Sequence, residues 1–423
     1  MKAFDKMVMT RRSVVSAGLA GGAALVLAGC GGNGGSADSG SAASSASGSA
    51  AAGKAGSVKA GLICLHDEQS TYDKNFIEAF NKACENLGIQ SVIKTNIPEG
   101  QECADAAAEL ADDGCTIIFA DSFGHEDFMI QTAQDNPGVQ FCHATGVKAH
   151  TQGLSNYHNA FASIYEGRYL AGVAAGLKIK EMIDKGEIKA ADAKMGYVGA
   201  YPYAEVKSGY TSFYLGAKSI VPEVTMDVTF TNSWYDETAE KEGANKLIDD
   251  KCVLISQHAD SMGAPTACEN ANIPNVSYNG STIEACPKTF IVSSRIDWTP
   301  YYEYAIGCVQ AGDPIDTDWV GTLATGSVVL TDINEKVAAQ NTAKAIDEVK
   351  KQLEDGTLHV FDTSTFKVKG KELSEYKADV DFDTNYEPDT DVVSDGYFHE
   401  SEKRSAPYFD IDIDGITILG DKK

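Results

Sequence analysis

The sequence has 423 residues, of which 61 are acidic and 35 are basic, so its formal net charge is −26. A surface of this sign repels phosphate backbones, which excludes nucleic acid as the expected partner. The sequence also contains no G-x-S-x-G, P-loop, H-E-x-x-H or strand-linked G-x-G-x-x-G pattern. We therefore expect neither an enzyme nor a bound cofactor.

Residues 1–30 have the pattern of a secretory signal peptide: a basic start, then an apolar run that is too short to span a bilayer. The run ends in L-A-G-C at Cys30, which resembles a bacterial lipobox. This resemblance implies that Cys30 is acylated and anchors the mature chain to the lipid bilayer, on the extracytoplasmic side of the cell membrane. Arg11 and Arg12 also fit a twin-arginine export signal, and an ordinary basic segment is the alternative.

Residues 31–57 are almost entirely Gly, Ser and Ala, which predicts a flexible linker. About 365 residues follow, enough for two lobes with sizeable cores. The chain has ten cysteines, and nine remain once Cys30 is acylated. Several lie in apolar runs, so we expect most to be small core residues and assign no disulfide.

Strands alternate with helices along the folded part. The first series of expected strands covers 58–65, 90–94, 116–120 and 139–144, with helices over 76–87, 103–111 and 127–134. The second series has strands over 194–199, 225–229, 252–257 and 275–278, with helices over 165–178, 208–219, 239–248 and 265–270. A further strand over 289–294 and a helix over 301–309 follow it. Short βα connections predict an α/β fold with two doubly wound parallel-sheet lobes joined by a multi-strand hinge.

Chain crossings near 155, 282 and 326 would build this hinge. They assign 58–155 plus 283–325 to the first lobe and 156–282 plus 326–370 to the second lobe. Residues 371–423 form an acidic C-terminal extension. Its isoleucines alternate at period two around Asp414-Gly415, which predicts a hairpin; the D-I-D-I-D-G run from Asp410 also fits a calcium loop as the alternative.

Several stretches together resemble the basic membrane protein (BMP) family of ABC-importer binding lipoproteins, which have the type I periplasmic binding fold. They are G-L-I-C-L-H-D at 61–67, S-T-Y-D at 70–73, I-Y-E-G-R-Y-L-A-G at 164–172, S-W-Y-D at 233–236, S-Q-H-A-D at 256–260 and Y-N-G at 278–280. The resemblance implies a solute-binding protein that works with an ABC permease. It also implies a flat heteroaromatic ligand: a purine nucleoside, a nucleobase or a flavin-like ring.

Ligands of open α/β sheets bind beyond the carboxyl ends of the strands, so the loops after strands supply the candidate site. Tyr72 and Trp234 offer rings for stacking, and Asp67 and Asp260 offer acceptors for N–H or O–H donors. Asp73 is a second possible acceptor after the first strand, or a helix N-cap. The full candidate set is Asp67, Thr71, Tyr72, Trp234, His258, Asp260, Asn279 and Arg295.

Two points stay open at this stage: the role of Arg295 and the function of the protein. Arg295 either binds a ligand carbonyl or carboxylate, or pairs with Asp297 or Glu303. The residues His66, His143, His258, Asp67 and Asp260 form an alternative set that suits zinc or manganese, which would make the protein a metal-capture lipoprotein. A lipoprotein that presents its ligand to a sensory receptor is a third alternative.

Overall fold

The structure is a computed structural model and describes residues 58–380 and 387–420. The expected signal peptide, Cys30 and the linker lie outside these residues. In the described part of the chain, no helix is long and apolar enough to cross a membrane. The nine cysteines described are all free, and eight of them are buried, as expected for small core residues.

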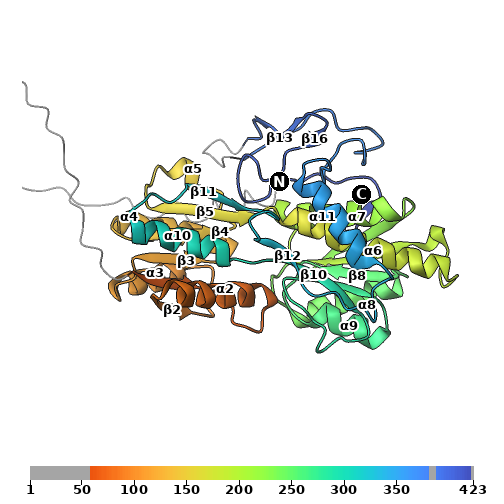
Figure 1. Cartoon of the computed structure of the whole chain (residues 1–423), viewed down its shortest axis with the longest axis horizontal. Coiled ribbons are helices and arrows are strands. Elements are labelled where there is room, and N and C mark those ends of the chain that lie inside the picture. Colours follow the sequence, from red (N-terminus) through yellow and green to blue (C-terminus); the bar gives the residue numbers. More distant parts are fainter. Residues whose placement is uncertain (1–57, 381–386, 421–423) are drawn as a thin grey trace, which may run out of the picture. The chain divides into compact units, whose positions relative to one another are not determined.

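The first lobe is built on a six-stranded parallel sheet with the order β11-β5-β4-β3-β1-β2. Its strands are β1 (Lys59–Ile63), β2 (Gln90–Lys94), β3 (Ile117–Ala120), β4 (Gln140–Ala144), β5 (Tyr157–Ala162) and β11 (Asp318–Gly321). Its helices are α2 (Thr71–Leu87), α3 (Gln101–Asp112), α4 (Glu126–Asp135), α5 (Ala149–Gln152) and α10 (Thr299–Ala311), with the 3-10 turn η2 (Phe123–His125). Figure 1 shows α2 and α10 next to one another beside this sheet.

The second lobe is built on a seven-stranded sheet with the order β12-β10-β9-β8-β6-β7-β17. Its strands are β6 (Lys194–Gly199), β7 (Thr225–Phe230), β8 (Leu254–Gln257), β9 (Asn275–Tyr278), β10 (Phe290–Ile296), β12 (Val328–Leu330) and β17 (Ile416–Ile418). Its helices are α6 (Ile164–Asp184), α7 (Ala204–Ile220), α8 (Glu237–Asp249), α9 (Gly263–Ala271) and α11 (Thr342–Glu354), with the 3-10 turn η3 (Ala190–Asp192). Only β12 is antiparallel to its neighbour among these described strands.

Side chains alternate between the two faces of each sheet, and helices cover both faces. In β1, Leu62 packs with Phe76 and Phe80 of α2, whereas the adjacent Ile63 packs with Leu110 of α3. This alternation follows from the period of two in a strand, and it buries each helix stripe against one face. The expected doubly wound α/β fold is therefore confirmed.

Helix α2 shows how local sequence sets an element that carries part of the site. Ser70 is the N-cap, and its hydroxyl accepts a hydrogen bond from the Asp73 backbone N–H at 3.2 Å. Gly88 ends the helix in the left-handed conformation, with φ of 63°. The helix start is thus fixed directly after the loop that leaves β1.

Helices α6 and α7 cross at two glycines. A Cβ atom at Gly172 would lie 2.1 Å from the Phe213 carbonyl oxygen, and one at Gly216 would lie 2.1 Å from the Tyr169 carbonyl oxygen. Both distances are far shorter than any tolerated contact. The absence of side chains at these two positions therefore sets the spacing of the two helices.

The chain crosses between the lobes later than expected at two of the three positions. Strand β5 pairs with β4 in the first sheet, and β10 pairs with β9 in the second. The first two crossings therefore follow residues 162 and 296, whereas the third lies between β11 and β12. The expected boundaries at 155 and 282 are wrong because β5 and β10 are each the last strand of their lobe's βα series.

The hairpin expected at Asp414-Gly415 is also wrong. Ile416–Ile418 forms β17, which pairs in parallel with β7 at the edge of the second sheet. Hairpin geometry instead occurs at Asp395-Gly396, where both residues have positive φ (49° and 87°) and join β15 (Val393–Ser394) to β16 (Tyr397–Phe398). The remaining short strands of the extension are β13 (Lys377–Ala378) and β14 (Thr390–Asp391).

The carboxylates of the alternative calcium loop point to separate protein partners. Asp410 accepts a hydrogen bond from the Tyr376 hydroxyl, Asp412 pairs with Lys207 at 2.7 Å, and Asp414 accepts from the backbone N–H groups of Lys369 and Gly370. These contacts tie the extension to itself and to α7. The geometry does not favour a calcium loop here.

Candidate functional site

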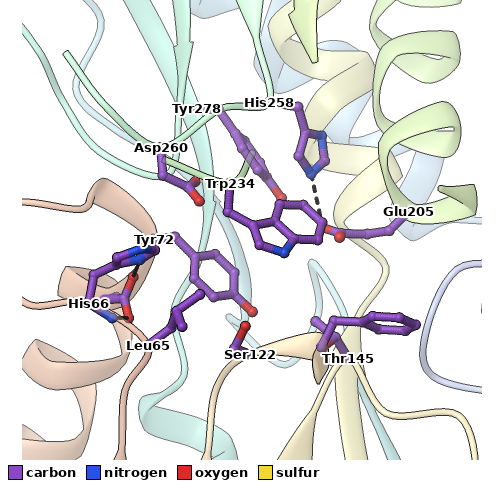
Figure 2. A pocket seen from close by; sticks show the side chains of 12 residues that line it. Leu65, His66, Tyr72, Ser122, Thr145, Glu205, Trp234, His258, Asp260 and Tyr278 are labelled. Carbon is purple, nitrogen blue, oxygen red and sulfur yellow. Dashed lines mark hydrogen bonds and ion pairs between the residues drawn. The ribbon is translucent and has the colours of Figure 1, made fainter. Parts of the chain in front are cut away.

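Twelve residues line a pocket between the two lobes at the carboxyl ends of the central strands (Figure 2). From the first lobe come loop residues after β1, β3 and β4 and the first turn of α2. From the second lobe come residues after β6, β7 and β8 and the last residue of β9. The lining residues are Leu65, His66, Tyr72, Asp73, Ser122, Phe123, Thr145, Glu205, Trp234, His258, Asp260 and Tyr278.

Four of the eight expected site residues line this pocket: Tyr72, Trp234, His258 and Asp260. Tyr72 is oriented by its hydroxyl, which donates to the Asp121 carbonyl oxygen at 2.7 Å. Figure 2 shows the rings of Tyr72 and Trp234 near one another, one from each lobe. Two aromatic faces are thus held on opposite sides of the same cleft.

Trp234 belongs to an aromatic cluster at the edge of the pocket. Its ring centroid lies 5.1 Å from that of Tyr201 and 6.0 Å from that of Tyr203. Tyr203 in turn contacts Phe123 of the first lobe at 5.6 Å. The cluster therefore packs against Trp234 and contacts Phe123 on the other side of the cleft.

His258 orients a carboxylate at the pocket wall. Its Nε2 lies 3.0 Å from Glu205 Oε1, and its Nδ1 lies 3.3 Å from the Tyr197 hydroxyl. Tyr197 also receives a hydrogen bond from the buried Arg168. A polar chain thus runs from the core of the second lobe to Glu205, and His258 acts mainly as a link in it.

Asp260 is a buried acceptor in the pocket wall, with 5% of its surface exposed. Burial raises its pKa well above the ordinary range, and the nearby charges of Asp73, Glu240 and Glu205 raise it further. Asn279 Nδ2 donates to one of its oxygens at 3.3 Å. The pocket wall therefore carries several carboxyl groups, and none of the twelve lining residues is Lys or Arg.

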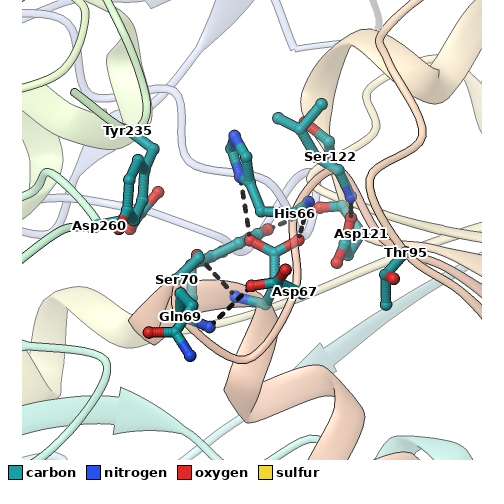
Figure 3. Close-up of polar contacts among 12 residues, drawn as sticks. His66, Asp67, Gln69, Ser70, Thr95, Asp121, Ser122, Tyr235 and Asp260 are labelled. Atoms are coloured by element: carbon teal, nitrogen blue, oxygen red, sulfur yellow. Dashed lines mark hydrogen bonds and ion pairs between the residues drawn. The ribbon is translucent and has the colours of Figure 1, made fainter.

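Asp73 is part of the pocket rather than the helix N-cap. Figure 3 shows His66, Asp67 and Ser70 of the loop before α2. Its carboxylate accepts a hydrogen bond from the His66 backbone N–H at 2.8 Å and lies 3.3 Å from His66 Nδ1. Burial alone would raise the pKa of Asp73, but the hydrogen bonds with His66 and Ser70 outweigh it and lower the pKa. These contacts lock the loop between β1 and α2.

Thr71, Asn279 and Arg295 connect the lobes and do not line the pocket. The Thr71 backbone N–H and hydroxyl both donate to the Asp260 carbonyl oxygen, at 3.1 and 3.2 Å. Asn75 Nδ2 donates to the Asn279 carbonyl oxygen at 2.9 Å, and Arg295 donates to Asn75 Oδ1 at 3.4 Å. Arg295 also pairs with Asp297 at 3.8 Å, so the structural interpretation of Arg295 fits the geometry.

Asp67 lies in the loop after β1 but outside the pocket, where it accepts hydrogen bonds from the Gln69 backbone N–H and from Asn96. The sequence reasoning missed six lining residues as ligand contacts: Leu65, Ser122, Phe123, Thr145, Glu205 and Tyr278. The signal was available for half of them. Ser122, Thr145 and Glu205 follow expected strands, and the same rule that selected Trp234 applies to them.

The alternative metal set is not brought together. His143 is buried and bonds the Ser122 carbonyl oxygen, His258 faces Glu205, and Asp67 makes a local turn. Within residues 58–380 and 387–420, the group of potential metal ligands with atoms within 4.8 Å of one another is Cys64, Asp73 and Asp121. Of that group, only Asp73 lines the pocket.

Little of the pocket is open. The free volume is about 20 Å³, which holds roughly one water molecule. A ring the size of a nucleobase therefore requires the lobes to separate or the aromatic side chains to move. Two α/β lobes around such a cleft define the class: a solute-binding protein of the periplasmic binding fold.

Comparison with known families and structures places the chain within that class. Residues 62–357 match the Bmp family, described as ABC transporter substrate-binding protein PnrA-like, and the chain belongs to this family. The fold also resembles ABC solute-binding proteins from Aeropyrum pernix (TM-score 0.61, 15% identity, 72% of this chain and 93% of that one) and Conexibacter woesei (TM-score 0.58, 20% identity, 71% and 98%). The chain is therefore a member of a family of ABC transporter substrate-binding proteins.

Two curated relatives differ in the solute that their names give. A purine-binding protein of Brucella abortus is 33% identical over 227 residues (53% of this chain, 61% of the relative). A Haloferax volcanii protein, provisionally named an ABC transporter glucose-binding protein, is 31% identical over 258 residues (61% and 62%). The chain thus matches about three fifths of the length of each relative, and the solute is a separate question from the family.

Proposed function

We propose that this protein captures a purine nucleobase or nucleoside in the interlobe cleft and delivers it to an ABC permease. The observation that carries the proposal is the pairing of aromatic faces with carboxyl acceptors in one pocket that has no Lys or Arg in its lining. A purine offers a flat π-face for Tyr72 and Trp234 and N–H donors for Asp260 and Glu205. The name of the Brucella relative supports the same solute class.

Closure of the lobes completes the site in this proposal. The Thr71 N–H begins α2 and has no partner within the helix, so it is free to donate to the Asp260 carbonyl oxygen of the second lobe when the lobes meet. The contact between Asn75 and Asn279 closes at the same time. Because little free volume remains in the cleft, we expect solute to enter an open form and to be enclosed by hinge closure.

A hexose is the competing solute, because sugars also use ring stacking and carboxylate acceptors, and the Haloferax relative's name mentions glucose. A flavin-like ring is a further candidate with the same chemistry. Isothermal titration of the protein with adenine, guanine, adenosine, guanosine, riboflavin and glucose separates these solutes. Saturable binding of a purine, without binding of glucose, is the expected result.

Trp234→Ala tests the stacking contact directly. Base stacking on an aromatic ring is worth roughly 1–3 kcal/mol, so the variant should bind the purine about 5- to 150-fold more weakly. Trp319→Ala is the matched control, because Trp319 lies on β11 and outside the twelve lining residues. Equal affinities of the wild type and Trp234→Ala, or binding of glucose alone, would contradict the proposal.

Membrane anchoring through Cys30 is part of the proposed function. We expect Cys30→Ala to abolish metabolic labelling with palmitate and to move the protein from the membrane fraction to the soluble fraction. Replacing Arg11 and Arg12 by lysine tests the export route. Loss of export in that variant indicates the twin-arginine pathway, and normal export indicates the general secretory pathway.

A further inference from the structure

A buried group of three side chains lies beside the cleft at the ends of β1 and β3. Cys64 follows β1, Asp121 follows β3, and Asp73 lies in the first turn of α2. The Cys64 sulfur and one carboxylate oxygen of each Asp lie within 4.8 Å of one another. All three residues are at most 1% exposed, which distinguishes them from the exposed acidic groups common on protein surfaces.

Part of this group lacks a partner. Asp121 Oδ1 accepts a hydrogen bond from the Leu65 backbone N–H at 3.1 Å, but Asp121 Oδ2 has no hydrogen-bond partner among the described residues. The Asp121 carboxyl interacts with Cys64 and Asp73, both of which are potential anions. A buried carboxylate oxygen without a donor is destabilising, so a ligand or a proton is needed at this position.

The surrounding imidazoles do not supply the missing partner. His125 Nδ1 lies 4.0 Å from Asp121 Oδ1, too far for a hydrogen bond. His66 faces Asp73 and not Asp121. The group therefore places two carboxyls and a thiol together in the protein interior. At most one histidine lies close enough to balance their negative charge.

We propose that Cys64, Asp73 and Asp121 bind a zinc ion beside the solute cleft. One thiolate and two carboxylates match zinc chemistry, whereas calcium and magnesium prefer oxygen ligands alone. Three protein ligands leave a fourth coordination position for water. Because Asp73 also lines the cleft, zinc would fix the first turn of α2, which carries Tyr72, whatever solute the cleft takes.

Cobalt(II) is the spectroscopic probe for this site, because a cobalt–thiolate bond produces a strong near-ultraviolet charge-transfer band. The measurements use the full chain with Cys308→Ser, since Cys308 is the one described cysteine that is not buried. We expect a saturable cobalt band that zinc displaces. Cys64→Ser should abolish the band, whereas Cys84→Ser, at another buried free cysteine, should keep it.

Thermal unfolding with and without zinc supplies a second readout. Zinc should raise the melting temperature of the parent, and Asp121→Asn should lose that shift while its metal-free form stays folded, because the change removes a buried carboxyl. Asp67→Asn, in the loop after β1 that also contains Cys64 but outside the group, should keep the shift. Zinc affinity should fall at least about tenfold in Asp121→Asn.

Three results would overturn the zinc site: no cobalt band in the parent, a band that persists in Cys64→Ser, or an equal zinc shift in the parent and Asp121→Asn. In those cases the two carboxyls share a proton instead. Purine titration in the presence of a chelator is measured separately. Failure of the zinc site therefore leaves the proposed solute binding intact, and failure of solute binding leaves the zinc site intact.

Discussion

Replacing Glu400 with glutamine should remove much of the loss of stability that we expect as the pH rises above 7. Glu400 lies in the C-terminal extension with 2% of its surface exposed. One oxygen accepts a hydrogen bond from the Tyr408 backbone N–H at 2.7 Å, and the other has no hydrogen-bond partner among the described residues. Burial raises the pKa of Glu400 to about 8, although the Tyr408 N–H and the charge of Arg404 act in the opposite direction.

Proton linkage determines the sign and size of the effect. The folded protein holds the Glu400 proton more tightly than the unfolded chain, where the pKa has its ordinary value of 4.5. The contribution to stability is therefore lost as the pH rises through the folded pKa. From pH 6.5 to pH 8.5, it falls from about 2 kcal/mol to about 0.2 kcal/mol.

Urea unfolding of the wild type and Glu400→Gln at pH 6.5 and pH 8.5 checks this prediction. Glutamine keeps the carbonyl that accepts the Tyr408 N–H but cannot ionise. Glu166 and Glu240, whose pKa values burial raises to about 7, titrate in both proteins, so the difference isolates Glu400. If the difference in unfolding free energy between the two proteins is the same at both pH values, the reasoning is refuted.

Three further changes have directions that follow from the structure. Gly172→Ala should destabilise the protein by about 1–3 kcal/mol, because the new Cβ would lie 2.1 Å from a carbonyl oxygen of α7. Asn75→Ala should weaken solute binding about 5- to 30-fold, because it removes a hydrogen bond between the closed lobes worth about 1–2 kcal/mol. Asp318→Ala should destabilise the folded state by about 1–3 kcal/mol, because its carboxylate joins β11 to the Ser405 backbone N–H in the extension at 2.7 Å.

For each of these three substitutions, a control variant or an outcome that would contradict the prediction can be given. Gly307→Ala in α10, where nothing lies within 4 Å of the new Cβ, should instead raise stability by up to about 1 kcal/mol. Calorimetric melting measures both glycine variants and Asp318→Ala. An unchanged melting temperature in Asp318→Ala would show that the extension does not stabilise the first lobe. Unchanged solute affinity in Asn75→Ala would argue against lobe closure on binding.

Local pattern was sufficient for most of the strands and helices that form the two sheets. The period of two in strands and the helical spacing in segments such as 76–87 depend only on neighbouring residues. The strand over 157–162 was missed, because His158 and Asn159 make it look polar although all six of its residues are buried. Their side chains are satisfied inside the lobe: His158 bonds the Asp316 carbonyl oxygen, and Asn159 accepts from the Ala149 backbone N–H.

The residues predicted for the candidate site also fall into two groups, those that the structure brings to the pocket and those that it does not. The rule that ligands meet the carboxyl ends of strands identified Tyr72, Trp234, His258 and Asp260 as residues that the structure brings to one pocket. It also selected Thr71, Asn279 and Arg295, because sequence position cannot distinguish a residue that faces the cleft from one that joins the lobes beside it. Whether these residues contact the solute stays a prediction.

The sequence by itself determined the α/β class, the two βα series and the family, because each depends on local periodicity and short motifs. Only the tertiary structure decided where the chain crosses between lobes and which edge the last strand joins. The isoleucines of 416–418 show the reason. Their alternation predicts a strand, but the partner strand β7 lies almost two hundred positions earlier in the chain, and strand pairing at that separation depends on which sheet edge the folded lobe leaves open.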